Sequence, residues 1–390
     1  MKPQAQPVYP AEGATRLAWV DSIKGLAILG ILLYHVVILI FDIPPFDHPK
    51  DDWLPLAERI ARLQPRPHET LAISLLANVL RYLGWLGYQG VHLFLVLSGF
   101  TLAYSLARRL PTADTNWRQF FQRRLWRLLP LYWAGHFFFL VFQALVGQLV
   151  AQPKISLLDS RFHLSLVGVR FLPTTFAYIS PAWWYFGLIV QLHLVFPLLW
   201  IWLQRKGLLH FWIATATITL VSRFIALIIV GNQREMWSMG ALFATRLFEF
   251  TFGMGLAYWL VHRPESLKHL WQKRWPLVAA GLAYLLALAL SFTVVGSIVA
   301  HSLIAVSLFG ISHAFSQYSL SSVKLLEQII GRMVRQTVLW ANDLASTPPV
   351  VVYCVGQRPS TWSALLGPAR PLSALDRAGI SGLQRNRRTY

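Results

Sequence analysis

The chain has 390 residues, of which 55% are hydrophobic and only 13% are charged. An average soluble domain has about 25% charged residues, so this composition excludes a disordered protein, a coiled coil and an ordinary cytosolic enzyme. The 35 Lys and Arg residues outnumber the 16 Asp and Glu residues, which gives a formal net charge of +19. Such an excess is typical of nucleic-acid-binding proteins or of membrane proteins with basic cytoplasmic loops, and the apolar composition favours the membrane class.

Apolar stretches of about 20 residues with few charges predict membrane-spanning helices. We count about eight such stretches, at residues 18–41, 86–107, 129–150, 182–203, 208–230, 240–261, 275–293 and 296–316. Trp and Tyr residues cluster near several of their ends, as they do in interfacial belts. The sequence therefore predicts an all-α fold, a polytopic bundle of transmembrane helices.

The basic loops predict the orientation of this bundle. The loops at residues 108–128, 204–207 and 262–274 carry an excess of Lys and Arg and fall on one side of the membrane if all the predicted spans are real. The 42–85 loop, where acids outnumber bases, falls on the other side. The positive-inside rule then places the N-terminus in the cytoplasm. We expect residues 42–85 and 151–181 to face outward and to shape an external substrate site.

The tail, residues 321–390, differs from the predicted membrane domain at residues 1–320. Hydrophobic periodicity stops near Gly331, and the composition becomes rich in Arg, Pro and Ser. We expect this atypical tail to be disordered or to be the product of a frameshift; a genuinely divergent tail is the alternative.

The first predicted span carries three ionisable side chains, Asp21, Lys24 and His35, and such residues inside a span are costly and usually functional. On a helix, the spacing of Lys24 and His35 places both on one face, about 16 Å apart along the axis. Asp21 and Lys24 are three residues apart and can pair. A long anionic donor from the cytoplasm could be held at Lys24 and react at His35. The alternative is a snorkelling lysine with a buried, hydrogen-bonded histidine.

Other charged residues lie at or inside the predicted spans. Arg124 and Arg127 share a helix face just before the third span, and guanidinium pairs match phosphate groups; the alternative is a basic anchor at the membrane boundary. Arg246 and Glu249 are three residues apart, and we expect them to neutralise each other. We interpret the isolated intramembrane histidines, His92 among them, as hydrogen-bonded core residues. The sequence has a single cysteine and no paired zinc spacing, so it predicts no metal site.

Residues 17–27, followed by Tyr34 and His35, resemble the first helix of the acyltransferase-3 family of membrane O-acyltransferases. That family typically has Asp-x-x-Arg-Gly there, with a His further along the helix. Lys24 stands at the position of the family's Arg, so the charge is kept but the bidentate geometry is lost.

Further segments resemble the family in the same order along the chain. They are residues 90–100 (the second-helix signature), 123–133 (the Arg-rich start of the third helix), 184–197 (the Trp…Gln…Phe-Pro segment) and 248–254 (a later helix). Ile189 and Val190 are apolar where many members carry acids. The resemblance covers residues 16–320, and the family commonly has ten spans, more than the sequence predicts here.

The resemblance implies an enzyme that transfers an acyl group, often acetyl from acetyl-CoA, to a hydroxyl of a cell-envelope carbohydrate, lipid or small molecule. It implies that His35, with Asp21, is the catalytic set, with His35 as the general base or the carrier of the acyl group. Lys24, Arg124 and Arg127 would hold the donor phosphates. The implied partners are acyl-CoA as donor substrate, membrane lipid and an envelope glycan or lipid acceptor, with no permanently bound cofactor, no metal and no nucleic acid.

The same resemblance implies a multi-pass protein of a cell membrane, and we expect the inner membrane of a bacterium. A transporter or flippase of a lipid-linked or small anionic solute is the alternative, with buried His and Arg residues along its path. Inverted repeats or broken helices would be expected of a transporter, and the sequence shows no repeat. A non-catalytic scaffold would leave Asp21, Lys24 and His35 without a role.

Overall fold

A computed structural model describes residues 17–41, 71–108, 115–146, 155–231 and 234–318. These residues are 87% helical and form no strand, which confirms the predicted all-α fold. All of them belong to one compact unit, Met1–Gly356. The expected tail at 321–390, and with it the expected boundary at residue 320, lies outside the described residues.

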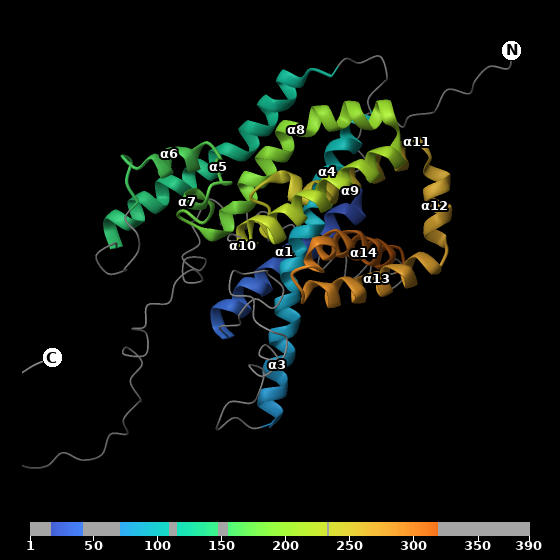
Figure 1. Cartoon of the computed structure of the whole chain (residues 1–390), viewed down its shortest axis with the longest axis horizontal. Coiled ribbons are helices and arrows are strands. Elements are labelled where there is room, and N and C mark those ends of the chain that lie inside the picture. Colours follow the sequence, from blue (N-terminus) through green and yellow to red (C-terminus); the bar gives the residue numbers. More distant parts are fainter. Residues whose placement is uncertain (1–16, 42–70, 109–114, 147–154, 232–233, 319–390) are drawn as a thin grey trace, which may run out of the picture. The chain divides into compact units, whose positions relative to one another are not determined.

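The helices follow one another along the chain with short connections between most of them (Figure 1). The α-helices are α1 (Ala18–Phe41), α3 (Leu71–Trp85), α4 (Gly90–Ala107), α5 (Trp117–Val146), α6 (Ser160–Leu166), α7 (Pro173–Phe176), α8 (Trp184–Lys206), α9 (Leu208–Phe224), α10 (Arg234–Met239), α11 (Leu247–His262), α12 (Pro264–Gln272), α13 (Trp275–Ser291) and α14 (Ser297–Tyr318). Three 3-10 helices, η1 (Leu86–Gln89), η2 (Pro181–Trp183) and η4 (Phe243–Arg246), and one π-helix, η3 (Ile225–Val230), complete the set in the described residues.

Within the described residues, six helical stretches are long and apolar enough to cross a membrane. They are Trp19–Val37, Leu76–Ala107, Trp117–Leu145, Pro181–Lys206, Leu208–Val230 and Ser297–Phe315. The pair α12 and α13, bent by 74°, raises the number to seven if it counts as one broken span. This count is lower than the eight-span prediction, but the chain is a polytopic helical bundle as predicted.

The predicted span at 240–261 accounts for one difference. Gly240 has a φ of 119°, a left-handed conformation that residues with a side chain rarely adopt, and η4 follows it. The α-helix α11 therefore begins only at Leu247 and has 16 residues.

The bundle is organised around the contact between α4 and α11. A Cβ atom added at Gly253 would lie 1.9 Å from the carbonyl oxygen of Val96, and one added at Gly99 would lie 1.9 Å from that of Phe250. Only glycine leaves room for backbones this close, as in the small-residue interfaces of membrane helices. The two helices therefore meet backbone against backbone.

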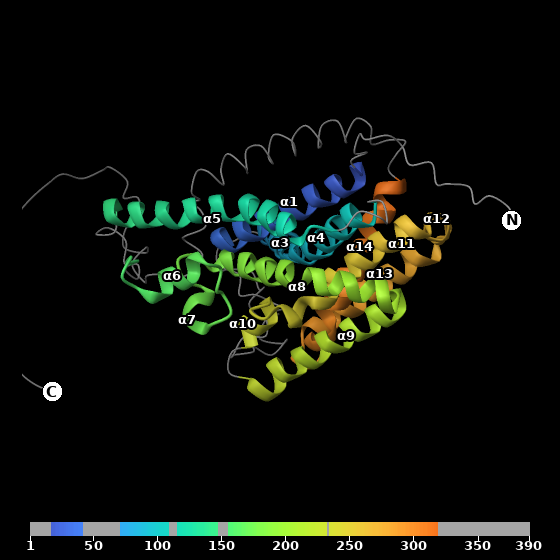
Figure 2. The same cartoon turned by 90° about the horizontal axis from the view of Figure 1, so that it is seen from above.

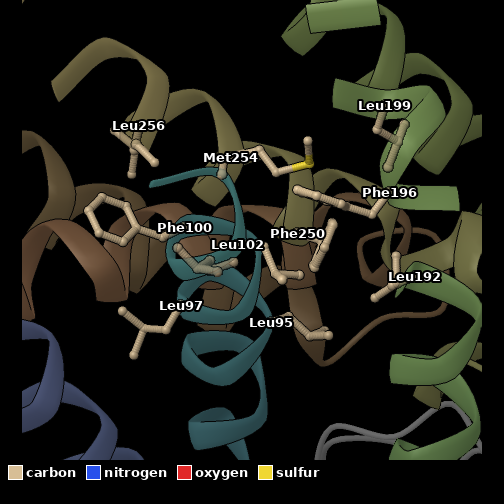
Figure 3. Packing of buried hydrophobic residues seen from close by; sticks show 14 of the residues in the cluster. Leu95, Leu97, Phe100, Leu102, Leu192, Phe196, Leu199, Phe250, Met254 and Leu256 are labelled. Carbon is tan, nitrogen blue, oxygen red and sulfur yellow. The ribbon is translucent and has the colours of Figure 1, made fainter. Parts of the chain in front are cut away.

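Large apolar side chains fill the space around this contact. Figure 3 shows side chains of α4, α11 and α8 packed together, with Phe250 lying between α4 and Phe196 of α8. The rings of Phe196 and Phe250 meet edge to face, with centroids 6.2 Å apart. In a membrane, van der Waals packing of this kind supplies much of the attraction between helices.

Contacts in register give the helix directions. Helices α4, α8 and α11 run parallel to one another. The pairs His92–Glu249 and Val96–Gly253 show this for α4 and α11, and the pairs Phe196–Phe250 and Trp200–Tyr258 show it for α8 and α11. Helices α1, α5 and α9 run opposite to them. For α1 against η1 and α4, the pairs are Ala27–Gly90 and Gly30–Gly87. For α5 against α8 they are Phe120–Phe196 and Tyr132–Phe186, and for α9 against α11 they are Thr219–Phe248 and Thr215–Thr251. Helices α13 and α14 lie side by side (Figure 2).

These directions collect basic residues at one end of the bundle, which we call the basic end. It holds the last residues of α4, α8 and α11 and the first turns of α1 and α5. Arg108 follows α4, Arg118 lies in the first turn of α5, Arg205 and Lys206 end α8, and Arg263 follows α11. We call the opposite end, where α4 and α11 begin, the far end.

One buried arginine hydrogen-bonds several parts of the connection between α5 and α8. Arg170 is fully buried, and its Nε donates to the hydroxyl of Tyr132 at 3.0 Å. Its Nη1 donates to the carbonyl oxygen of Tyr178 at 2.6 Å, and its Nη2 to the hydroxyl of Ser165 at 2.6 Å. That hydroxyl also lies 2.7 Å from Nε2 of His136. Arg170 therefore fixes the connection to α5.

We expect Arg170→Leu to loosen the connection at residues 155–181. The substitution leaves several buried polar groups without a hydrogen bond, each at a cost of about 1–3 kcal/mol. Hydrogen exchange of this segment should become faster by about 10-fold or more. Arg161→Leu is the control from the same segment, because Arg161 is 46% exposed, forms its ion pair with Asp159 two residues away and, among the described residues, contacts only the ring of Tyr178 beyond that. Equal rates of hydrogen exchange in the two variants would contradict the proposal that Arg170 fixes this segment.

We also expect Gly253→Ala to destabilise the bundle, because the added Cβ atom forces α4 and α11 apart. Overpacking of this kind costs about 1–3 kcal/mol, so the temperature of thermal unfolding in detergent should fall. Gly281→Ala in α13 is the control, since nothing lies within 4 Å of its added Cβ atom. A fall of the same size in both variants would argue against a special role of the α4–α11 contact.

Candidate functional site

The three predicted residues of the first span lie on one continuous helix. Asp21, Lys24 and His35 are half-buried along α1. The Nδ1 atom of His35 is buried and has no hydrogen-bond partner among the described residues. A buried ring nitrogen without a partner is unusual, and it leaves this imidazole able to accept or give a proton.

The two predicted arginines lie on α5. Arg124 is half-buried, with its guanidinium 5.8 Å from the ring centroid of Phe120, while Arg127 is exposed. The ring of Phe120 stacks on Phe196 of α8, with centroids 5.3 Å apart. Arg124 therefore lies at the contact of α5 with α8.

The structure separates the predicted site residues along the bundle. Lys24 lies in the half of α1 nearest the basic end, and Arg124 and Arg127 lie in the same half of α5. His35 lies in the other half of α1, toward the far end. Lys24 and His35 thus lie in different halves of α1.

A second group of ionisable residues was not predicted as a site. We call it the buried ionic cluster, and it consists of His92, Arg223, Arg246, Glu249 and His301. All five are at most 3% exposed. They come from α4, α9, η4, α11 and α14 and meet because each lies near the far end of its helix.

His92 and Arg246 share the carboxylate of Glu249. Nδ1 of His92 lies 3.1 Å from Oε2, and Nη1 of Arg246 donates to Oε1 at 2.9 Å. Nη1 of Arg246 also lies 3.0 Å from Nδ1 of His92. A ring nitrogen cannot donate and accept at once, and a proton on Nδ1 that is donated to the carboxylate makes the stronger, charge-assisted bond. The expected interaction of Arg246 with Glu249 is therefore confirmed, with His92 as an additional partner.

Arg223 extends the cluster toward α14. Its Nε and Nη2 donate to the carbonyl oxygen of Ser297 at 3.0 and 2.7 Å, and Nη2 also contacts Nδ1 of His301. These partners are neutral when His301 is neutral. With two guanidinium groups and one carboxylate, the cluster then has an excess of positive charge.

A series of aromatic rings joins the cluster to α1. The ring centroids of Tyr34 and Tyr88 are 6.1 Å apart, and those of Tyr88 and His92 are 6.0 Å apart. The ring of His301 follows at 5.1 Å from His92. Since Tyr34 precedes His35, the cluster lies one aromatic layer away from the part of α1 that carries the predicted base.

Gln191 of α8 fixes the turn that leads to the cluster. Its Nε2 donates to the carbonyl oxygen of Ala241 at 2.9 Å, and its Oε1 accepts from the backbone N–H of Phe243 at 3.1 Å. This turn runs directly into η4, which ends at Arg246. The glutamine of the Trp…Gln…Phe-Pro segment therefore has a structural task, positioning Arg246.

The interpretation of His92 as an isolated core histidine was incomplete. It is buried as expected, but it belongs to an ionic cluster with partners 154 and 157 residues away in the chain. The available signal was the set of ionisable residues in separate spans, each functional by default. The described residues contain no group of His, Cys, Asp and Glu that could hold a metal ion.

Comparison with known families identifies the chain. The family model described as an acyltransferase domain, of type 3, matches residues 17–334. No curated protein and no solved structure matches. The match covers the whole described bundle, including α1 and the buried ionic cluster. The chain therefore belongs to the acyltransferase-3 family and is a membrane acyltransferase.

Proposed function

We propose that the protein transfers an acyl group, commonly acetyl, from a cytoplasmic acyl-CoA to a hydroxyl of a cell-envelope carbohydrate, lipid or small molecule. The observation that carries this proposal is the arrangement on α1, where a cation in the first half of the helix and a half-buried histidine in the second half share one helix. The positive-inside rule supports a cytoplasmic basic end and N-terminus. We assign the protein to the cell membrane, as a bacterial inner-membrane protein.

The donor would bind at the basic end. Lys24, Arg124 and Arg127 lie in the halves of α1 and α5 that begin at that end, and guanidinium and ammonium groups bind phosphate. The spacing of Lys24 and His35 along a helix, about 16 Å, suits the pantetheine arm of a coenzyme A thioester. Asp21, one turn before Lys24, would orient that ammonium group.

His35 would act as the general base. The acceptor oxygen attacks the acyl carbon, its proton passes to His35, the carbon–sulfur bond breaks, and the sulfur finally takes up the proton. The absence of a described partner at Nδ1 of His35 supports a ring that is held loosely enough to exchange a proton.

A transporter or flippase of an anionic solute is the second candidate. The bent pair α12 and α13 and the buried positive excess around Arg223 favour it, because transporters place broken helices and buried charges along their paths. It predicts solute movement that needs no acyl donor. Solute flux by proteoliposomes without acyl-CoA would support it, and acyl transfer without flux would exclude it.

His35→Gln should abolish the acyl modification of the cell envelope. Loss of a general base lowers a rate by about 10²- to 10⁴-fold. Mass spectrometry of surface glycans and lipids, at matched protein levels, measures the product and names both acyl group and acceptor. His262→Gln is the control, since His262 is exposed at the end of α11 and bonds only its own helix. Retained modification in His35→Gln would exclude His35 as the base.

Arg124→Gln and Arg127→Gln should raise the KM for acyl-CoA and leave kcat nearly unchanged. A lost charge-assisted hydrogen bond costs about 1.5–3 kcal/mol, or roughly 10- to 100-fold in KM. An acyl-pantetheine donor, which has no nucleotide phosphates, should be used equally well by the variants and the wild type. Steady-state kinetics with both donors tests this, with Arg161→Gln as control. An equal rise in KM for both donors would contradict phosphate binding.

A further inference from the structure

We propose that the turn between α12 and α13, together with the outward face of α13, binds an anionic phospholipid. Lys273 and Arg274 in this turn hold the headgroup phosphate, and the apolar side chains of α13 pack against the acyl chains. This surface lies outside the residues to which the acyl transfer proposed above assigns a role, so the two proposals are independent.

Helix α12 lies across the basic end of the bundle. The ring centroid of its Trp271 is 3.5 Å from that of His313, which is 5.2 Å from that of Trp19 in the first turn of α1. The axis of α12 makes an angle of 74° with that of α13. Since α13 lies beside α14, which carries a candidate span (Figure 2), α12 runs nearly parallel to the membrane surface.

The inward side of α12 is fixed to the bundle. Leu267 is only 1% exposed, and the hydroxyl of Ser266 accepts a hydrogen bond from the indole N–H of Trp259 of α11 at 2.8 Å. A helix that buries its apolar side in this way and lies in the membrane plane belongs at the level of the lipid headgroups.

The basic residues of the turn between α12 and α13 are directed away from the bundle. Lys273 and Arg274 are both exposed. No carboxylate of the described residues forms an ion pair with either of them. Guanidinium and ammonium groups bind phosphate, and at this level the phosphates of the lipid headgroups are within their reach.

Helix α13 presents an apolar stripe that begins directly after this turn. The residues of the stripe are more than half exposed and recur at helical spacing on one face: Trp275, Val278, Leu282, Leu285 and Leu286. The opposite face packs on α14, where a Cβ atom added at Gly310 would lie 3.2 Å from Cβ of Ala280. The N–H of Val278 donates to the carbonyl oxygen of Arg274 at 3.3 Å, so the stripe is continuous with the turn.

This combination matches both parts of an anionic phospholipid. The stripe matches the acyl chains, the two bases match the charged headgroup, and an exposed Trp between them is typical of the interface. A nucleotide phosphate would pair with the bases but would leave the apolar stripe without a partner. A zwitterionic lipid has the same chains but no net charge, so the bases favour the anionic lipid.

Contact quenching at one position of the stripe tests the proposal. The full chain, with Cys354→Ser at its single cysteine, carries a fluorophore at Leu282→Cys and is placed in phosphatidylcholine vesicles. Brominated phosphatidylglycerol or brominated phosphatidylcholine is added, and the ratio of their quenching measures which lipid occupies the stripe. We expect a preference for phosphatidylglycerol of about 5-fold or more, as for a basic residue near an anionic membrane surface, and a decrease of this preference with salt.

The double variant Lys273→Gln and Arg274→Gln should reduce the preference to nearly one, because the bases are lost while the stripe remains. The double variant Arg205→Gln and Lys206→Gln is the matched control, since it removes the same charges from exposed residues at the basic end, on α8. It should keep the preference. Each preference is a ratio measured on one protein, so it does not depend on the amount of folded protein.

An unchanged preference in the variant of Lys273 and Arg274 would overturn the proposal. An equal loss in the control would also overturn it, because it indicates a general attraction of anionic lipid to the basic end. Quenching by neither lipid would show that the stripe does not face the bilayer. Coenzyme A should leave the preference unchanged, and its displacement of phosphatidylglycerol would assign the two bases to the acyl donor instead.

Discussion

The backbone contact between α4 and α11 is the constraint on which the rest of the bundle depends. Gly99 and Gly253 remove the Cβ atoms that would hold the two helices apart. Because the two backbones are this close, Nδ1 of His92 and Oε2 of Glu249 can approach to 3.1 Å. The apolar side chains of α8 then pack against both helices at once (Figure 3). A change at either glycine therefore acts on the core and on the buried ionic cluster together.

Burying the ionic cluster lowers the stability of the fold, which indicates that the cluster serves a function. Taking charges out of a polar medium carries a penalty that even a good ion pair only partly offsets, and apolar residues of the same volume are often as stable. The cluster has two guanidinium groups for one carboxylate, and Arg223 is held by a carbonyl oxygen and an imidazole. Ionisable groups kept inside a membrane protein at such a cost usually serve transport or chemistry.

The helix directions connect this cluster to the rest of the site. Parallel α4, α8 and α11 end in the basic connections, and their other ends carry the cluster or approach it. Antiparallel α1 begins at the basic end and brings His35 toward the opposite half. The acyl donor proposed to bind at Lys24, Arg124 and Arg127 would therefore present its reactive end toward the half of α1 that carries His35. Along α1, acyl transfer would thus take place at the end of the helix opposite to the one that begins at the basic end.

The sequence alone was sufficient for features that depend on local spacing. Apolar stretches predicted the all-α membrane bundle, and the three-residue spacing of Arg246 and Glu249 predicted their interaction, because neighbours one turn apart on a helix face each other. The start of α11 at Leu247 was missed, since it depends on the backbone of Gly240 and on the hydrogen bonds of Gln191. The partnership of His92 with Glu249 joins residues 157 positions apart. Only tertiary packing decided it, because no periodicity within one helix determines which face of another helix it will meet.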